Sequence, residues 1–195
     1  IGNQSVLVSR TGWTGEVGVE IYGRQGIDHL ALWDAIFEAG KSFDLTWHAA
    51  DAMGTRRIEA GIFDNGTDLD KGLTPAMAGL GKFVDFNNKT FIGREALISC
   101  SSQRLLFGIM TDTLIPTSNF EVHKNDKIVG KITAGDWSPE LNCGIGYVRF
   151  YEPTEISETW LHQKVFIKDN SNSFFEAKVV DLPFFDKDKK IPKIA

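Results

Sequence analysis

Six short runs in which apolar and polar residues alternate constrain the fold of this chain more than any other feature. They lie at residues 105–110, 121–123, 128–132, 146–150, 165–168 and 176–180, and turn residues separate them. Successive side chains of a strand point to opposite faces, so this period is typical of strands with one buried face. Six such strands at short spacing predict a small antiparallel barrel.

The first half of the chain shows the three- and four-residue spacing of helices. Apolar residues within 26–40 form the stripe of an amphipathic helix, with Gly40 as its expected C-cap. A second helix is predicted at about 48–60, ended by Gly61, and a short third helix at about 94–98. Helices and strands are thus segregated along the chain, which predicts the α+β class.

A change of texture near Cys100-Ser101-Ser102 places a domain boundary there. We therefore expect a first domain at residues 1–100 and a C-terminal β-barrel domain at residues 101–195. Residues 186–190 alternate Asp and Lys, which predicts a solvated tail. The chain begins at Ile1 with strand-like residues and no initiator Met, so we expect a fragment whose first strand has neighbours outside it.

Composition argues against several classes of partner. The chain has 21 Lys and Arg against 26 Asp and Glu, a net charge of −5, so it lacks the basic footprint of a nucleic-acid binder. No stretch approaches the ~20 apolar residues that span a bilayer, and we expect no membrane partner. Cys100 and Cys143 lack the spacing of a metal site or a disulfide framework, which favours two reduced thiols in a cytoplasmic protein.

Residues 9–22, which read SRTGWTGEVGVEIY, combine turn chemistry, aromatic surface and two carboxylates. The residues before them alternate as a strand does, three glycines at three-residue spacing predict a tight turn, and residues 19–22 resume a strand. Such a hairpin can present Trp13 and a carboxylate to one pocket, although glycine-rich turns also occur where nothing binds.

Glu20 lies between Val19 and Ile21, so its side chain points to the opposite face of the strand. It is either an exposed surface carboxylate or the acceptor of paired hydrogen bonds from an amino-pyrimidinone ring such as a pterin. Trp13 and Tyr22 are expected to flank it. Each is either a core aromatic or part of the wall of a ligand site.

The segment resembles the pattern S-R-T-G-[YFW]-T-G-E-x-G-x-E-[IL] of the glycine-cleavage T-proteins and their tetrahydrofolate-dependent relatives. Further matches follow in the order of that family, at residues 57–61, 68–70, 74–75, 79–81, 91–97, 130–135, 138–139 and 183–184. The resemblance covers the C-terminal half of such a protein. It implies the C-terminal part of the T-protein folate-binding fold followed by the barrel, tetrahydrofolate as the cofactor, and the missing N-terminal half of the same protein as a partner.

Within that resemblance, Glu20 matches the glutamate that holds the pterin, and Trp13 and Trp137 are further candidates for binding the cofactor. Trp137 lies in a segment, residues 135–139, that is similar to a family loop covering the folate site, and its alternative is a structural role. Arg57 matches a family arginine and is predicted to bridge to Glu59 or Asp68.

Two departures from the family pattern bear on the substrate. Trp13 stands where the T-proteins usually have Tyr or Phe, and Tyr22 follows the glutamate by two residues. This combination looks more like dimethylsulfoniopropionate demethylase, whose substrate is a sulfonium cation that an aromatic wall attracts. Met53-Gly54 stands where T-proteins carry Arg-Asp, whose arginine contacts the folate. Trp13 and Tyr22 are therefore the candidate substrate-binding residues.

The resemblance predicts an enzyme, a tetrahydrofolate-dependent one-carbon transferase that moves a methyl group from a small donor such as dimethylsulfoniopropionate to tetrahydrofolate. Two alternatives stay open: a glycine-cleavage T-protein that transfers an aminomethyl group, and a non-catalytic folate-binding module of the same family. The catalytic residues are unknown and expected in the N-terminal half. No metal site is expected, because the four histidines share no metal-ligand spacing.

Overall fold

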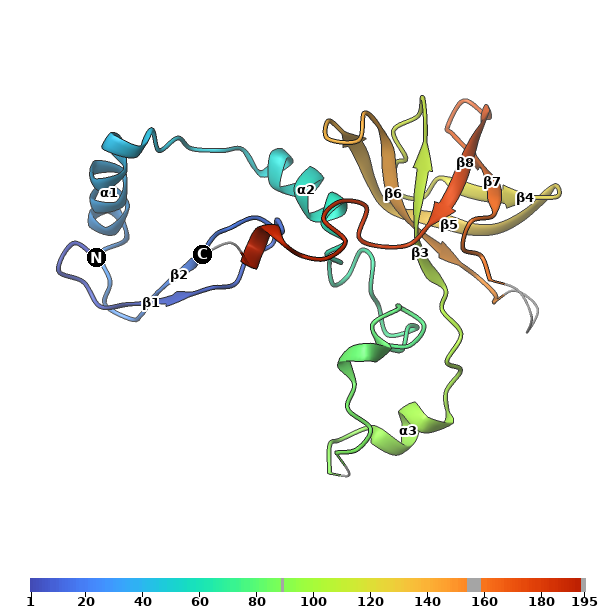
Figure 1. Cartoon of the computed structure of the whole chain (residues 1–195), viewed down its shortest axis with the longest axis horizontal. Helices are drawn as coiled ribbons and strands as arrows, with labels where there is room; N and C mark the ends of the chain where they lie inside the picture. The colour runs from blue at the N-terminus through green and yellow to red at the C-terminus, as the bar shows by residue number, and fades with distance from the viewer. Residues whose placement is uncertain (89, 154–158, 194–195) are drawn as a thin grey trace.

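The second half of the chain forms a closed barrel, and an open arrangement of helices and one hairpin precedes it (Figure 1). This computed structural model describes residues 1–88, 90–153 and 159–193. The helices and strands of the first half are β1 (Val6–Ser9), β2 (Glu20–Gly23), α1 (His29–Gly40), α2 (Ala50–Glu59) and α3 (Arg94–Ser99). The barrel strands are β3 (Leu106–Thr111), β4 (Glu121–Lys124), β5 (Lys127–Ser138), β6 (Cys143–Phe150), β7 (Lys164–Lys168) and β8 (Phe174–Val180). Short 3₁₀ helices lie at η1 (Lys41–Phe43), η2 (Gly81–Phe83) and η3 (Ile191–Lys193).

The six predicted strands form the barrel, in the order β3-β6-β5-β4-β7-β8, and every pairing is antiparallel. The ring closes where β3 pairs with β8, with Gly108 opposite Val180. This confirms the predicted α+β class and the barrel. Strand β5 is longer than predicted, so the segment at residues 135–139, expected to be a loop, is largely the end of this strand.

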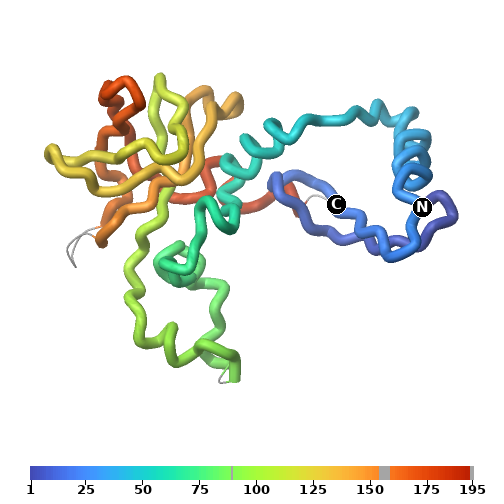
Figure 2. Tube along the Cα trace, turned by 180° about the vertical axis from the view of Figure 1, so that it is seen from behind, coloured from blue at the N-terminus to red at the C-terminus, as the bar shows by residue number. Residues whose placement is uncertain are grey.

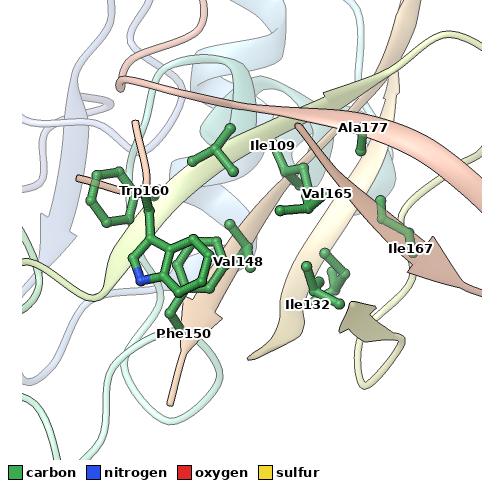
Figure 3. Close-up of a cluster of buried hydrophobic side chains, with 11 residues drawn as sticks. Ile109, Ile132, Val148, Phe150, Trp160, Val165, Ile167 and Ala177 are labelled. Carbon is green, nitrogen blue, oxygen red and sulfur yellow. The ribbon is translucent and has the colours of Figure 1, made fainter. Parts of the chain in front are cut away.

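The interior of the barrel is filled by buried apolar side chains (Figure 3). Buried and exposed residues alternate along β7 and β8, whereas β3 and β6 are buried over almost their whole length. In β7, Val165 and Ile167 are fully buried, whereas Phe166 between them is 44% exposed. At one end Phe150 and Trp160 stack with ring centroids 4.0 Å apart. The barrel is therefore a packed core and not an open channel.

A second apolar cluster joins α2 to the outside of the barrel. It includes Ile58 of α2, Tyr147 of β6 and Phe184 after β8. The Tyr147 hydroxyl donates to the carbonyl oxygens of Arg57 and Ile58, at 3.1 Å each. Burial raises the pKa of Tyr147, so this hydroxyl stays a donor at the end of α2.

The hairpin and α1 lie away from the barrel, and α2 and the C-terminal segment lie between the two (Figures 1 and 2). Helix α1 is preceded by Asp28 as its N-cap, whose side chain accepts from the Ala31 amide at 3.0 Å. None of the described helices has the length and apolar character that crossing a membrane requires.

Two helix ends test the predicted caps. Gly61 follows α2 with φ of +69°, the left-handed conformation in which glycine ends helices, and that prediction is confirmed. Gly40 is different: it belongs to α1 with a right-handed φ of −78°, and Lys41 is the C-cap. The Gly40 prediction is wrong because the chain continues directly into a 3₁₀ turn.

Two further predictions are corrected. The tight turn of the hairpin is a loop at residues 10–19, because Ser9 pairs with Glu20 and the strands end there. The segment at residues 186–190 is a folded turn and not a solvated tail, since the Asp186 carboxylate accepts from the Lys190 amide at 2.9 Å and Lys189 donates to the Ala60 carbonyl.

Candidate functional site

The hairpin places Glu20 at the start of β2, next to two hydroxyl groups. The Tyr22 hydroxyl donates to Glu20 Oε2 at 2.9 Å, and the Thr11 hydroxyl donates to the same oxygen. Tyr22 reaches this oxygen because residues two apart on a strand share a face. The hydrogen bond from Thr11, and then that from Tyr22, lowers the pKa of Glu20 below 4.5. The carboxylate is therefore ionised at neutral pH and stays exposed to solvent.

Trp13 lies against α2, and Arg57 is its neighbour. The Arg57 guanidinium carbon is 5.2 Å from the centroid of the Trp13 ring and 5.8 Å from that of Tyr147. Its Nη1 donates to Asp68 Oδ2 at 2.7 Å, which confirms the predicted bridge to Asp68. Trp13 keeps 37% of its surface exposed. The structure thus pairs Glu20 with Tyr22, and Trp13 with a buried cation.

A second arginine connects the same loop to the barrel. Arg56 pairs with Glu16 of the loop and with Glu59 of α2. Glu59 is 1% exposed and accepts from Ser138 Oγ at 2.5 Å. The loop is therefore fixed to α2, and α2 to β5, by hydrogen-bonded charges.

A hollow of about 350 Å³ lies beside the loop. Its lining comes from the loop, from Ile62 and from the C-terminal segment: Arg10, Thr11, Gly12, Gly15, Glu16, Gly18, Ile62, Lys189 and Pro192. Thr11 lines this hollow and also donates to Glu20. Arg10 Nη2 donates to the Pro192 carbonyl at 3.1 Å and closes one side. Thr11 therefore connects the predicted carboxylate to this hollow.

Trp137 belongs to β5, where it pairs with Gly144 of β6 and is half-buried. No contact recorded among the described residues joins it to Glu20, Trp13 or Tyr22. Its neighbour Asp136 accepts from Thr55 of α2, so this end of β5 also contacts α2. Over the described ranges, no three His, Cys, Asp or Glu side chains gather as metal ligands would.

Sequence reasoning missed Thr11 and the partners of two carboxylates: Glu16 pairs with Arg56, and Glu59 binds Arg56 and Ser138 and not Arg57. Thr11 follows the end of β1 by two residues, and its hydroxyl was a usable signal, since Ser and Thr side chains outside regular structure often bind neighbouring groups. No local pattern predicts the pairing of Glu16 with Arg56 or of Glu59 with Ser138, because these partners lie 40 and 79 positions apart in sequence.

Comparison with known proteins places these features in a family. The model of the GCVT N-terminal domain matches residues 1–88, and the model of the glycine cleavage T-protein C-terminal barrel domain matches residues 104–186. The chain belongs to the glycine-cleavage T-protein family. The match to the first model includes the hairpin, α1 and α2, and the match to the second includes all six barrel strands.

Curated family members are similar along the chain. The aminomethyltransferase of Caldanaerobacter subterraneus subsp. tengcongensis is 36% identical over 195 residues, covering 97% of this chain and 50% of that protein. The aminomethyltransferase of Alkaliphilus oremlandii is 41% identical over 152 residues, covering 75% of this chain and 41% of that protein. The chain therefore spans about half the length of the curated relatives it matches.

A solved structure shares the fold. The crystal structure of glycine cleavage system aminomethyltransferase T from Bartonella henselae superposes with a TM-score of 0.73, at 24% identity, covering 93% of this chain and 50% of that one.

Proposed function

We propose that this chain is the C-terminal half of a tetrahydrofolate-dependent aminomethyltransferase, and that its hairpin binds the folate. Family membership supports the enzyme class, and the curated relatives described above carry the name aminomethyltransferase. The observation that carries the folate site is the Glu20 carboxylate, which Thr11 and Tyr22 keep ionised on the hairpin.

A pterin suits this carboxylate. Its amino-pyrimidinone edge presents two adjacent N–H donors, and an ionised carboxylate offers two acceptor oxygens. Both hydrogen bonds to Glu20 from the described residues end on Oε2, which leaves Oε1 as a further acceptor. Trp13 and Trp137 remain predicted contacts of the cofactor, one from the hairpin loop and one from the barrel.

Bound tetrahydrofolate supplies the nitrogen that accepts the one-carbon unit, and the work of these residues is to hold its ring in place. Alignment of donor and acceptor contributes about 7–11 kcal/mol in favourable reactions. A rigidly placed carboxylate is suited to this task, because it fixes both the position and the rotation of a flat ring.

The N-terminal half of the enzyme is the proposed partner of the hairpin and α1. An isolated two-stranded hairpin is marginally stable in water. Leu7 and Val8 of β1 are 54% and 50% exposed, and Leu30 and Trp33 of α1 are 78% and 48% exposed. Exposed apolar surface of this kind indicates a protein interface. We expect the N-terminal half to cover it and to bring the catalytic residues.

Methyl transfer from dimethylsulfoniopropionate is the second candidate. It rests on Trp13 and Tyr22 as an aromatic wall and on Met53-Gly54 in place of the family's Arg-Asp. In the structure, Trp13 already has the Arg57 guanidinium beside it, and the Tyr22 hydroxyl is bound to Glu20. Both aromatic side chains thus have other partners, which favours the aminomethyl donor, in agreement with the names of the relatives.

Calorimetric titration with tetrahydrofolate tests the site. The protein is expressed with any coding sequence that lies in frame upstream of this chain. Glu20→Gln keeps the shape and removes one acceptor and the charge, so we expect affinity to fall by about tenfold or more. Glu38→Gln is the matched control, because Glu38 pairs with Lys41 on the exposed side of α1. It is expected to leave the affinity unchanged.

Measurements of turnover with each donor distinguish the candidate functions. Aminomethyl transfer to tetrahydrofolate supports the proposal, and methyl transfer from dimethylsulfoniopropionate without aminomethyl transfer supports the second candidate. Folate binding without either reaction indicates a non-catalytic module. A wild-type protein that does not bind folate contradicts all three.

A further inference from the structure

The loop at residues 10–19 is connected to the barrel through a chain of four side chains. Trp13 packs on the Arg57 guanidinium, and Arg57 donates to Asp68 Oδ2 at 2.7 Å. Asp68 Oδ1 in turn accepts from Thr133 Oγ1 of β5 at 2.7 Å. The path runs from the hairpin across α2 to a barrel strand, over three parts of the chain that are distant in sequence.

Burial makes this path rigid. The side chain of Asp68 is 0% exposed and that of Arg57 is 9% exposed. A buried carboxylate and guanidinium must satisfy each other, since water cannot replace either partner. The position of the guanidinium is therefore fixed from the barrel side, and this group lies over the Trp13 ring.

Loop backbone also approaches α2 closely at this point. A Cβ added to Gly15 would lie 2.7 Å from the Ala60 Cβ, so the loop has no room to shift toward the helix. Arg56 adds a second link to Glu16, but its side chain is 29% exposed and Glu16 is 42% exposed. Exposed ion pairs hold geometry weakly, which leaves the Arg57 path as the stronger of the two.

We propose that Arg57 is a positioning residue of the folate site, which holds Trp13 and with it the loop that carries Thr11 to Glu20. The inference rests on the proposed function and adds a role for a residue that does not touch the ligand. The planar guanidinium is essential to it. A lysine keeps the charge beside Asp68 but offers no flat face to the indole ring.

Arg57→Lys is the test, with folate affinity as the first measurement. Loss of the guanidinium contact to Trp13 is expected to raise the Kd for tetrahydrofolate about fivefold. Arg104→Lys is the matched control: Arg104 also pairs with a carboxylate, Asp181, and lies over a ring, that of Phe107, within the barrel. It is expected to leave the Kd unchanged.

A double-mutant cycle identifies the path. If Arg57 acts through Trp13, Arg57→Lys does not change the Kd for tetrahydrofolate any further in a Trp13→Leu background. Trp13→Phe retains an aromatic ring, so it is expected to keep most of the affinity that Trp13→Leu loses. Equal and additive effects of Arg57→Lys and Trp13→Leu overturn the inference.

A second measurement follows the loop itself and stays informative if Arg57→Lys is less stable. The Glu20 carboxyl carbon is titrated by NMR in each variant. A displaced loop removes the Thr11 hydrogen bond, so the pKa of Glu20 rises toward 4.5 in Arg57→Lys and stays low in Arg104→Lys. An unchanged Glu20 pKa in Arg57→Lys overturns the inference.

The outcomes distinguish this inference from the function beneath it. Wild-type protein that binds folate, loses affinity in Glu20→Gln and keeps it in Arg57→Lys refutes the role of Arg57 alone. Wild-type protein without folate affinity refutes the proposed function and this role together.

Discussion

Asp68 is the buried carboxylate on which the junction of α2 with the barrel depends. Its two oxygens accept from Arg57 Nη1 at 2.7 Å, from Thr133 Oγ1 at 2.7 Å and from the Asp64 amide at 2.8 Å. Asp68→Asn keeps the volume and one acceptor oxygen, but it turns an NH₂ group toward these donors and leaves the Arg57 charge without a counter-ion. Breaking a buried ion pair from one side costs about 3–5 kcal/mol, and we expect the free energy of unfolding to fall by this amount.

Asp70 provides a control two residues away. It pairs with Arg149 Nη1 at 2.5 Å, but its side chain is 54% exposed. The pKa of Asp70 is lowered, first by the hydrogen bond from Arg149 and then by that from the Gly72 amide, so Asp70 binds its arginine as a carboxylate. In Asp70→Asn water solvates the released arginine, and we expect a much smaller loss than in Asp68→Asn.

Urea unfolding, followed by tryptophan fluorescence and circular dichroism, measures both variants. With a slope of about 2 kcal/mol per molar urea, a loss of 3–5 kcal/mol moves the midpoint down by about 1.5–2.5 M. If the midpoint of Asp68→Asn falls no further than that of Asp70→Asn, burial of the Arg57 pair does not stabilise the junction, and the reasoning is refuted.

Two further predictions concern the hairpin and α2. Tyr22→Phe removes the hydrogen bond from the Tyr22 hydroxyl to Glu20, so the pKa of Glu20 rises toward 4.5 and its carboxylate becomes protonated at a higher pH on acidification. NMR titration of the Glu20 carboxyl carbon measures this pKa, and an unchanged value contradicts the hydrogen bond. Gly61→Ala and Gly54→Ala are expected to shift the unfolding midpoint in opposite directions. At Gly61, where φ is +69°, an added Cβ lies 3.0 Å from the Pro183 Cα, so Gly61→Ala is expected to lower the free energy of unfolding by more than about 1 kcal/mol. At Gly54, inside α2, an added Cβ meets nothing within 4 Å, so Gly54→Ala is expected to raise the free energy of unfolding by about 0.5–1 kcal/mol. Two midpoints that move the same way contradict this.

The barrel was predictable because its signal is local. In β7 the buried Val165 and Ile167 alternate with the exposed Phe166, and this period of two is visible in the sequence before any partner strand is known. The ends of strands were less predictable. Strand β5 runs on to Ser138 because it pairs with β6 to Cys143, and this pairing depends on a strand that comes later in the chain.

The proximity of Glu20 and Tyr22 was predictable from the sequence, and the contacts of the loop were not. Glu20 and Tyr22 lie two residues apart on one strand, so their proximity follows from strand geometry. The contacts that join the loop to α2, and Asp68 and Glu59 to the barrel, connect residues 40, 65 and 79 positions apart in sequence. Polar pairs at such separations leave no periodic pattern in the sequence from which they could be predicted. The glycines that suggested a tight turn belong instead to a loop that contacts Arg56 and Arg57.

The buried charges where α2 meets the barrel are better suited to fixing the orientation of α2 than to raising the stability of the fold. Apolar side chains of similar volume often stabilise a buried interface as well as an ion pair does, because they avoid the desolvation of charge. This chain nevertheless buries Arg57, Asp68 and Glu59 where α2 meets the barrel, beside an apolar cluster that already joins the two. Hydrogen-bonded charges accept few alternative geometries, whereas apolar contacts tolerate sliding. A junction of this kind is expected where the direction of a neighbouring group matters, and here that group is the loop that carries Thr11 to Glu20.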